Sequence, residues 1–114
     1  MESLVKQFAD LLAKEGRGLS LRSGDKVLVG IGFAEEAVLW FKHRGAIILG
    51  FEGFRTDGAS LYALLEYIAD FSAIRGAPEE RVGRCADAAL MVLRKWDHGP
   101  EFVEFILTAP DSFG

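Results

Sequence analysis

The sequence predicts a single α+β domain over residues 1–114, with a sheet of about four mostly antiparallel strands packed against three to four helices. Two observations support this prediction. Segments with helical and with β-strand patterns follow one another in a mixed order along the chain. Half of the 114 residues are hydrophobic, and a chain of this length can bury enough surface for one core.

The first elements are a helix and a hairpin. Apolar residues at helical spacing predict an amphipathic helix at about residues 2–15, and the glycine that follows is typical of a helix end. Two β-rich segments, 19–22 and 26–31, lie on either side of Ser23-Gly24-Asp25. A short turn with a glycine between two such segments predicts a β-hairpin.

Residues 34–44 fit two interpretations. The segment begins with glutamates and ends with basic residues, which is the charge order that the helix dipole favours. We therefore expect a helix there. The alternative is a strand from Val38 to Lys42 within a meander.

The second half predicts two strands and two helices. Residues 46–52 are apolar and bounded by glycines, as in a buried strand. A loop then leads to a helix at 58–71, capped by Asp57 or Ser60, with its apolar stripe at Leu61, Leu64, Leu65, Ile68 and Phe71. Another helix begins at Pro78 and ends at Gly99, after Arg94, Lys95 and His98, and residues 102–108 form the last strand.

Composition limits the class of protein. The formal net charge is -4 and the isoelectric point about 5.1, which argues against direct binding of nucleic acid. The longest apolar runs are too short to span a bilayer, and the N-terminal residues carry charges where a signal peptide needs an apolar core. Cys85 has no cysteine partner. We therefore expect a cytoplasmic protein in a reducing compartment.

No motif in the sequence indicates a catalytic, metal or cofactor site. Gly30-Ile31-Gly32 resembles the start of a dinucleotide-binding turn, but Glu35 replaces the third glycine and would repel a pyrophosphate. His43 and His98 are too few and too far apart in the sequence for a metal site. Cys85 falls on the apolar stripe of its helix, where a thiol acts as a small inert hydrophobe.

The predicted helix at 58–71 and the loop before it form the strongest candidate for a binding surface. Tyr62, Glu66 and Asp70 share one face at helical spacing, with Tyr67 beside them. Tyrosines are enriched at interfaces, and acidic side chains accelerate association with a basic partner. The alternative is that a tyrosine leans into the core and leaves only its hydroxyl in water.

Part of this region resembles a known family. The run Ala46-Ile47-Ile48-Leu49-Gly50, followed by Gly53-Phe54-Arg55-Thr56-Asp57, is similar to small bacterial immunity proteins that neutralise colicin-type nucleases. The resemblance covers only this stretch of the chain. It implies a non-catalytic inhibitor that fills a basic nuclease cleft with acidic side chains, here Glu52, Asp57, Glu66 and Asp70.

Three hypotheses of function follow. The first is a non-catalytic interaction protein, of the toxin-neutralising kind, that binds a basic protein partner such as a toxin or nuclease. Its expected binding residues are Glu52, Arg55, Asp57, Tyr62, Glu66, Tyr67 and Asp70. The second is an enzyme or ligand-binding domain with a site assembled from Arg55, Asp57 and His98. The third is a homo-oligomeric structural protein such as a homodimer, because the chain is rich in large apolar side chains.

Overall fold

The computed structural model describes residues 3–16, 20–23, 26–96 and 99–109, and it confirms the predicted α+β class. His98 and the tip of the predicted first hairpin lie outside the described residues. In chain order the elements are α1 (Leu4–Lys14), β1 (Ser20–Ser23), β2 (Lys26–Gly30), a 3-10 turn η1 (Ile31–Phe33), α2 (Ala34–His43), β3 (Ile47–Thr56), β4 (Leu61–Asp70), α3 (Pro78–Lys95) and β5 (Phe102–Thr108).

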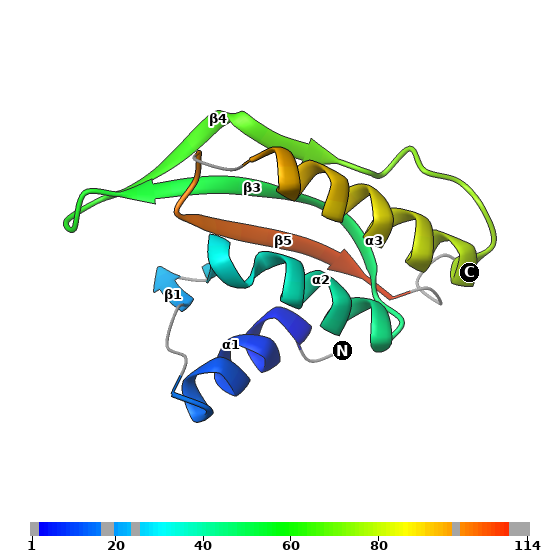
Figure 1. Cartoon of the computed structure of the whole chain (residues 1–114), viewed down its shortest axis with the longest axis horizontal. Coiled ribbons are helices and arrows are strands. Elements are labelled where there is room, and N and C mark those ends of the chain that lie inside the picture. The colour runs from blue at the N-terminus through cyan, green and yellow to red at the C-terminus, as the bar shows by residue number, and fades with distance from the viewer. Residues whose placement is uncertain (1–2, 17–19, 24–25, 97–98, 110–114) are drawn as a thin grey trace.

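The strands form one five-stranded sheet in the order β1-β2-β5-β3-β4, and every neighbouring pair is antiparallel. The last strand in the chain, β5, therefore lies in the middle of the sheet, between β2 and β3. Strand β4 is one edge of the sheet. The hairpin that β4 makes with β3 extends past the ends of the helices (Figure 1).

The predicted helix at 58–71 is wrong, because Leu61–Asp70 forms strand β4. Its pairing with β3 contains an irregularity: Glu52 pairs with Ile68, but the next residue, Gly53, pairs with Leu64. Leu65, Glu66 and Tyr67 therefore bulge out of register with β3. The helical spacing does not place the apolar residues on one face, because Leu61 pairs with Thr56 and Leu64 with Gly53, which point to opposite faces of the sheet. Two residues of the expected buried stripe, Leu65 and Ile68, are exposed instead.

The strand predicted at 46–52 is confirmed but continues to Thr56 as β3, so the predicted loop begins only after Thr56. The other predicted elements are confirmed where they are described. Of the segment 34–44, residues Ala34–His43 form helix α2, so the alternative strand is wrong. Helix α2 has Glu35 and Glu36 in its first turn and basic residues in its last, which suits the helix dipole. The Ser3 side chain accepts a hydrogen bond from the Lys6 backbone amide and caps α1. Pro78 begins α3, where its missing amide hydrogen costs nothing.

The three α-helices lie on one face of the sheet (Figure 1), and the main core fills the space between them. Phe51 on β3 is at its centre, with no exposed surface, and its ring makes edge contacts with three others. A chain of edge-to-face ring contacts crosses the molecule from β4 to α1 through this residue: Tyr67, Trp96, Phe51, Phe105, Phe41 and Phe8.

Close approach between β3, β4 and the segment before β5 depends on glycine. A Cβ atom added to Gly53 would lie 2.7 Å from Pro100 Cβ and 2.9 Å from Tyr67 Cβ, and neither neighbour is the flexible end of a side chain. A Cβ atom at Gly99 would overlap the Tyr67 ring. These two glycines leave room for the Tyr67 side chain to pack against β3 and the segment before β5.

Gly53→Ala should lower the free energy of unfolding by about 1–3 kcal/mol, because the added methyl group overpacks this contact. Urea denaturation measures the change. Gly83→Ala is the matched control: it lies inside α3 with open space around its Cβ position, and the same substitution there should stabilise the protein by about 0.5–1 kcal/mol. Equal effects at the two positions would contradict the packing argument.

Candidate interaction surface

The β3–β4 hairpin carries all the predicted binding residues, but the structure does not bring them onto one face. Tyr62 pairs with Arg55, whereas Asp70 pairs with Gly50. Since successive residues of β3 point to opposite faces of the sheet, Tyr62 and Asp70 lie on opposite faces. The predicted single face with both side chains is therefore wrong, for the same reason that the predicted helix is wrong.

Asp57 organises the tip of the hairpin rather than capping a helix. Its Oδ1 accepts hydrogen bonds from the backbone amides of Ala59, at 3.0 Å, and Ser60, at 2.8 Å. Its Oδ2 accepts a hydrogen bond of 2.7 Å from the Tyr62 hydroxyl. The Tyr62 bond, followed by the two amides, lowers the pKa of Asp57 to about 2. The same bond raises the pKa of Tyr62.

Arg55 and Thr56 attach the hairpin to the segment that leads into β5. The Arg55 Nε donates to the Gly99 carbonyl oxygen at 2.9 Å, and the Thr56 amide donates to the Glu101 carboxylate at 3.0 Å. Both contacts hold backbone in place. Arg55 and Asp57 are the two described residues of the catalytic hypothesis. Their contacts show that both have structural roles in the hairpin.

Tyr67 packs against Trp96 at the edge of the core. Its ring meets Trp96 edge-on, with 5.2 Å between ring centroids, and covers Gly99. It is half-buried, in agreement with the alternative in which a tyrosine leans inward. The exposed large side chain in this part of β4 is Leu65 instead, which lies in the bulge beside Glu66 and is 81% exposed.

Glu66 and Asp70 are both exposed acids of the edge strand. Asp70 also ends the strand: its Oδ1 accepts a hydrogen bond of 2.9 Å from the Ser72 amide, and the hydrogen bonds with Ser72 lower the pKa of Asp70. Among the described residues, no side chain forms an ion pair with Glu66.

One face of the sheet has no helix on it within the described part of the chain. On β5, Val103 and Phe105 point toward the helices and are buried, whereas Glu104 is half-buried and Ile106 is 47% exposed. The partners on β3 and β4 extend this pattern, because Glu104 pairs with Glu52, which pairs with Ile68. We call this region the open sheet face and define it by five residues: Glu52, Ile68, Asp70, Glu104 and Ile106.

The open sheet face has a shallow depression of about 270 Å³ over Gly50, bordered by Glu52, Ile68, Asp70 and Ile106. Glu104 lies beyond Glu52 and is held by Lys26, whose Nζ is 3.4 Å from its carboxylate. Sequence reasoning missed Ile68, Glu104 and Ile106 as surface residues. Two of them could have been found from the strand predicted at 102–108. Successive residues of a strand point to opposite faces, so Glu104 and Ile106 lie on the face opposite the buried Val103 and Phe105.

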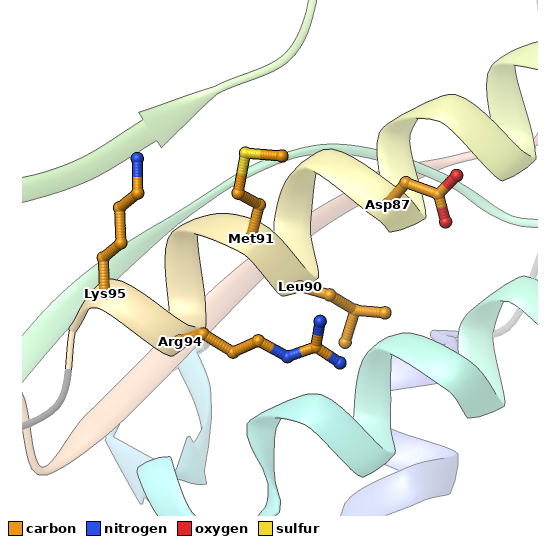
Figure 2. Close-up of a pocket in the computed structure, with 5 residues that line it drawn as sticks. All are labelled: Asp87, Leu90, Met91, Arg94 and Lys95. Carbon is orange, nitrogen blue, oxygen red and sulfur yellow. The ribbon is translucent and has the colours of Figure 1, made fainter.

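A second depression, of about 460 Å³, lies along α3 and is shown in Figure 2. Leu90 and Arg94 point toward α2, and Met91 and Lys95 point away from it (Figure 2). Arg94 is engaged by Glu35 at 3.1 Å, so the guanidinium bridges the two helices. This surface mixes both signs of charge, and its polar groups do not converge on one point.

The structure gives no support to a reactive cysteine or a metal site among the described residues. Cys85 is fully buried, and burial raises the pKa of its thiol, so it stays protonated as a packing residue. In the described part of the chain, no group of three or more His, Cys, Asp or Glu residues could hold a metal ion. Nor does any described helix have the length and apolar character needed to cross a membrane.

The chain matches no protein-family model, no curated protein and no solved structure. The similarity to nuclease-immunity proteins therefore rests on the quoted residues alone and stays a prediction.

The Asp57–Tyr62 pair predicts a specific pH dependence. A carboxyl group whose pKa is lower in the folded state stabilises the fold above its unfolded pKa of 3.8, and that contribution is lost as the pH falls toward 2. Tyr62→Phe should raise the pKa of Asp57 toward 3.8, while the two backbone amides keep it below that value. Titration of the Asp57 carboxyl carbon by NMR measures both values, and an unchanged pKa in the variant would contradict the assignment.

Proposed function

We propose that this protein is a non-catalytic binding protein that engages a basic protein partner, such as a toxin or nuclease, through its β3–β4 hairpin. The observation that carries the proposal is the composition of the hairpin surface. Over residues 47–70 the acidic residues are Glu52, Asp57, Glu66 and Asp70, and the only basic residue is Arg55. Apolar side chains are exposed among these carboxylates, chiefly Leu65 and Ile68.

This combination suits protein recognition. Exposed apolar side chains supply the area that an interface removes from water, and carboxylates around them steer a basic partner and exclude acidic ones. The hairpin is held in shape by Asp57 at its tip and by Arg55 in its outer half. A binding surface that is already ordered loses less entropy on association. If the resemblance to immunity proteins applies, the basic partner is a nuclease whose cleft these acids fill.

The enzyme hypothesis has less support. The Nε of Arg55 donates to a backbone carbonyl oxygen, and the Asp57 carboxylate accepts three hydrogen bonds within its own turn. With a pKa of about 2, Asp57 is a weak base at neutral pH.

The homodimer hypothesis retains one specific observation. Strand β4 is an edge of the sheet, and on Leu61–Leu64, before the bulge, it carries no proline or charged residue to discourage pairing with another strand. Sedimentation equilibrium at micromolar concentration tests it, and a monomer would exclude it.

The proposal is tested by affinity capture from source-cell lysate at low and high salt, followed by identification and purification of the captured protein. The purified partner should bind the wild type in a fixed ratio, more weakly as salt rises. Glu66→Lys combined with Asp70→Lys should weaken binding at least about tenfold, because it reverses two exposed charges of the edge strand.

The control is Asp87→Lys, which repeats one of these two charge reversals at an exposed position of α3. It should leave affinity within about twofold of the wild type. Circular dichroism checks that Asp70→Lys does not unfold the strand end. Equal affinity of the double variant and the wild type would reject the hairpin as the binding surface.

A further inference from the structure

The open sheet face contains an arrangement that folding alone does not favour. Glu52 and Glu104 lie directly opposite one another on adjacent strands, and like charges in that position are destabilising. Lys26 compensates Glu104. No described side chain forms a hydrogen bond or ion pair with Glu52, although Glu52 is half-buried.

The surroundings of Glu52 combine an apolar floor with negative charge. Ile68 lies beside it on β4 and is 51% exposed, and Ile106 is exposed one strand away on β5. Asp70 borders the same depression. A lysine or arginine side chain fits such a surface, because its aliphatic stem packs on apolar groups while its charged end reaches a carboxylate.

We propose that the open sheet face binds an amphipathic segment of the partner, with apolar side chains on Ile68 and Ile106 and a lysine or arginine between Glu52 and Asp70. This inference rests on the proposed function and specifies where on the molecule the basic partner docks. Charge complementarity selects this occupant over a second copy of the chain. Two such faces opposed would bring the uncompensated carboxylates Glu52 and Asp70 of one copy against the acidic face of the other.

The decisive variant is Glu52→Lys. It reverses the charge at the centre of the face, yet it replaces a like-charge cross-strand pair by an opposite pair with Glu104, so the fold should tolerate it. Its melting temperature should equal or exceed that of the wild type by up to about 5 °C. Glu52→Gln, which only removes the charge, serves as the second variant.

The probe is a short synthetic peptide of alternating leucine and lysine, and the control peptide has glutamate in place of lysine. Binding is followed by amide chemical shifts in NMR and by calorimetry. With the wild type, the shifts should concentrate at residues 50–52, 68–70 and 104–106. Affinity should fall about tenfold in Glu52→Lys, less in Glu52→Gln, and by under about twofold in Asp87→Lys.

The outcomes separate the two proposals. If the lysine peptide binds but its shifts map to Glu66 and the hairpin tip, and Glu52→Lys binds like the wild type, the docking site is wrong while the proposed function stands. If the wild type does not bind the lysine peptide and captures no basic partner from lysate, the proposed function fails and the docking site fails with it. If Asp87→Lys weakens the peptide as much as Glu52→Lys, binding depends on net charge only and the site is rejected.

Discussion

The fold depends on the ring contacts of Phe51. This side chain has no exposed surface, and its centroid lies 5.1 Å from that of Trp96, 5.5 Å from Phe105 and 5.6 Å from Phe71. Each edge contact between aromatic rings contributes about 0.5–1.5 kcal/mol beyond the burial of area. The three partners come from the end of α3, from β5 and from the residue after β4, so one position couples the sheet to the helix that covers it.

That coupling also explains why the hairpin can carry so many polar and exposed apolar groups. Its inner half is fastened through Phe51 and Tyr67, and its outer half is held by hydrogen bonds of Asp57, Arg55 and Thr56. The exposed positions of β4 are therefore not needed to form the core. Leu65, for example, is exposed without loss to the core.

Sequence reasoning identified the elements whose signals are local. Glutamates before and basic residues after 34–44 marked α2, and Pro78 marked the start of α3, because dipole and capping effects act within a few residues. It failed at β4, where Leu61, Leu64 and Ile68 have helical spacing but the chain pairs with β3 instead. Asp57-Gly58, a dipeptide typical of hairpin turns, was the local signal for this pairing, and the helical spacing outweighed it. The bulge at Leu65–Tyr67 depends on the register with β3, which the spacing of apolar residues does not reveal.

The predicted binding residues fall on one hairpin, but the sequence did not show which of them share a face. The hairpin contains every predicted binding residue, and the alternative in which a tyrosine points into the core is correct for Tyr67. Which residues face outward depends on strand register. The open sheet face combines β3, β4 and β5, and nothing in the sequence places Ile106 near Asp70. Burial of Tyr67 against Gly99 likewise depends on a contact between distant segments.

The central place of β5 has a consequence for how the chain acquires its structure. Until β5 is available, β1–β2 and β3–β4 are two separate hairpins, with the facing edges of β2 and β3 unpaired. Because β5 follows every other described strand, the ribosome releases it last of the strands, and the early segments wait with open edges during synthesis. The sheet then closes through contacts between residues far apart in sequence, such as Val29 with Val103, and such closure is slow. Before β5 pairs, the open edges of β2 and β3 in the nascent chain can form wrong strand pairs.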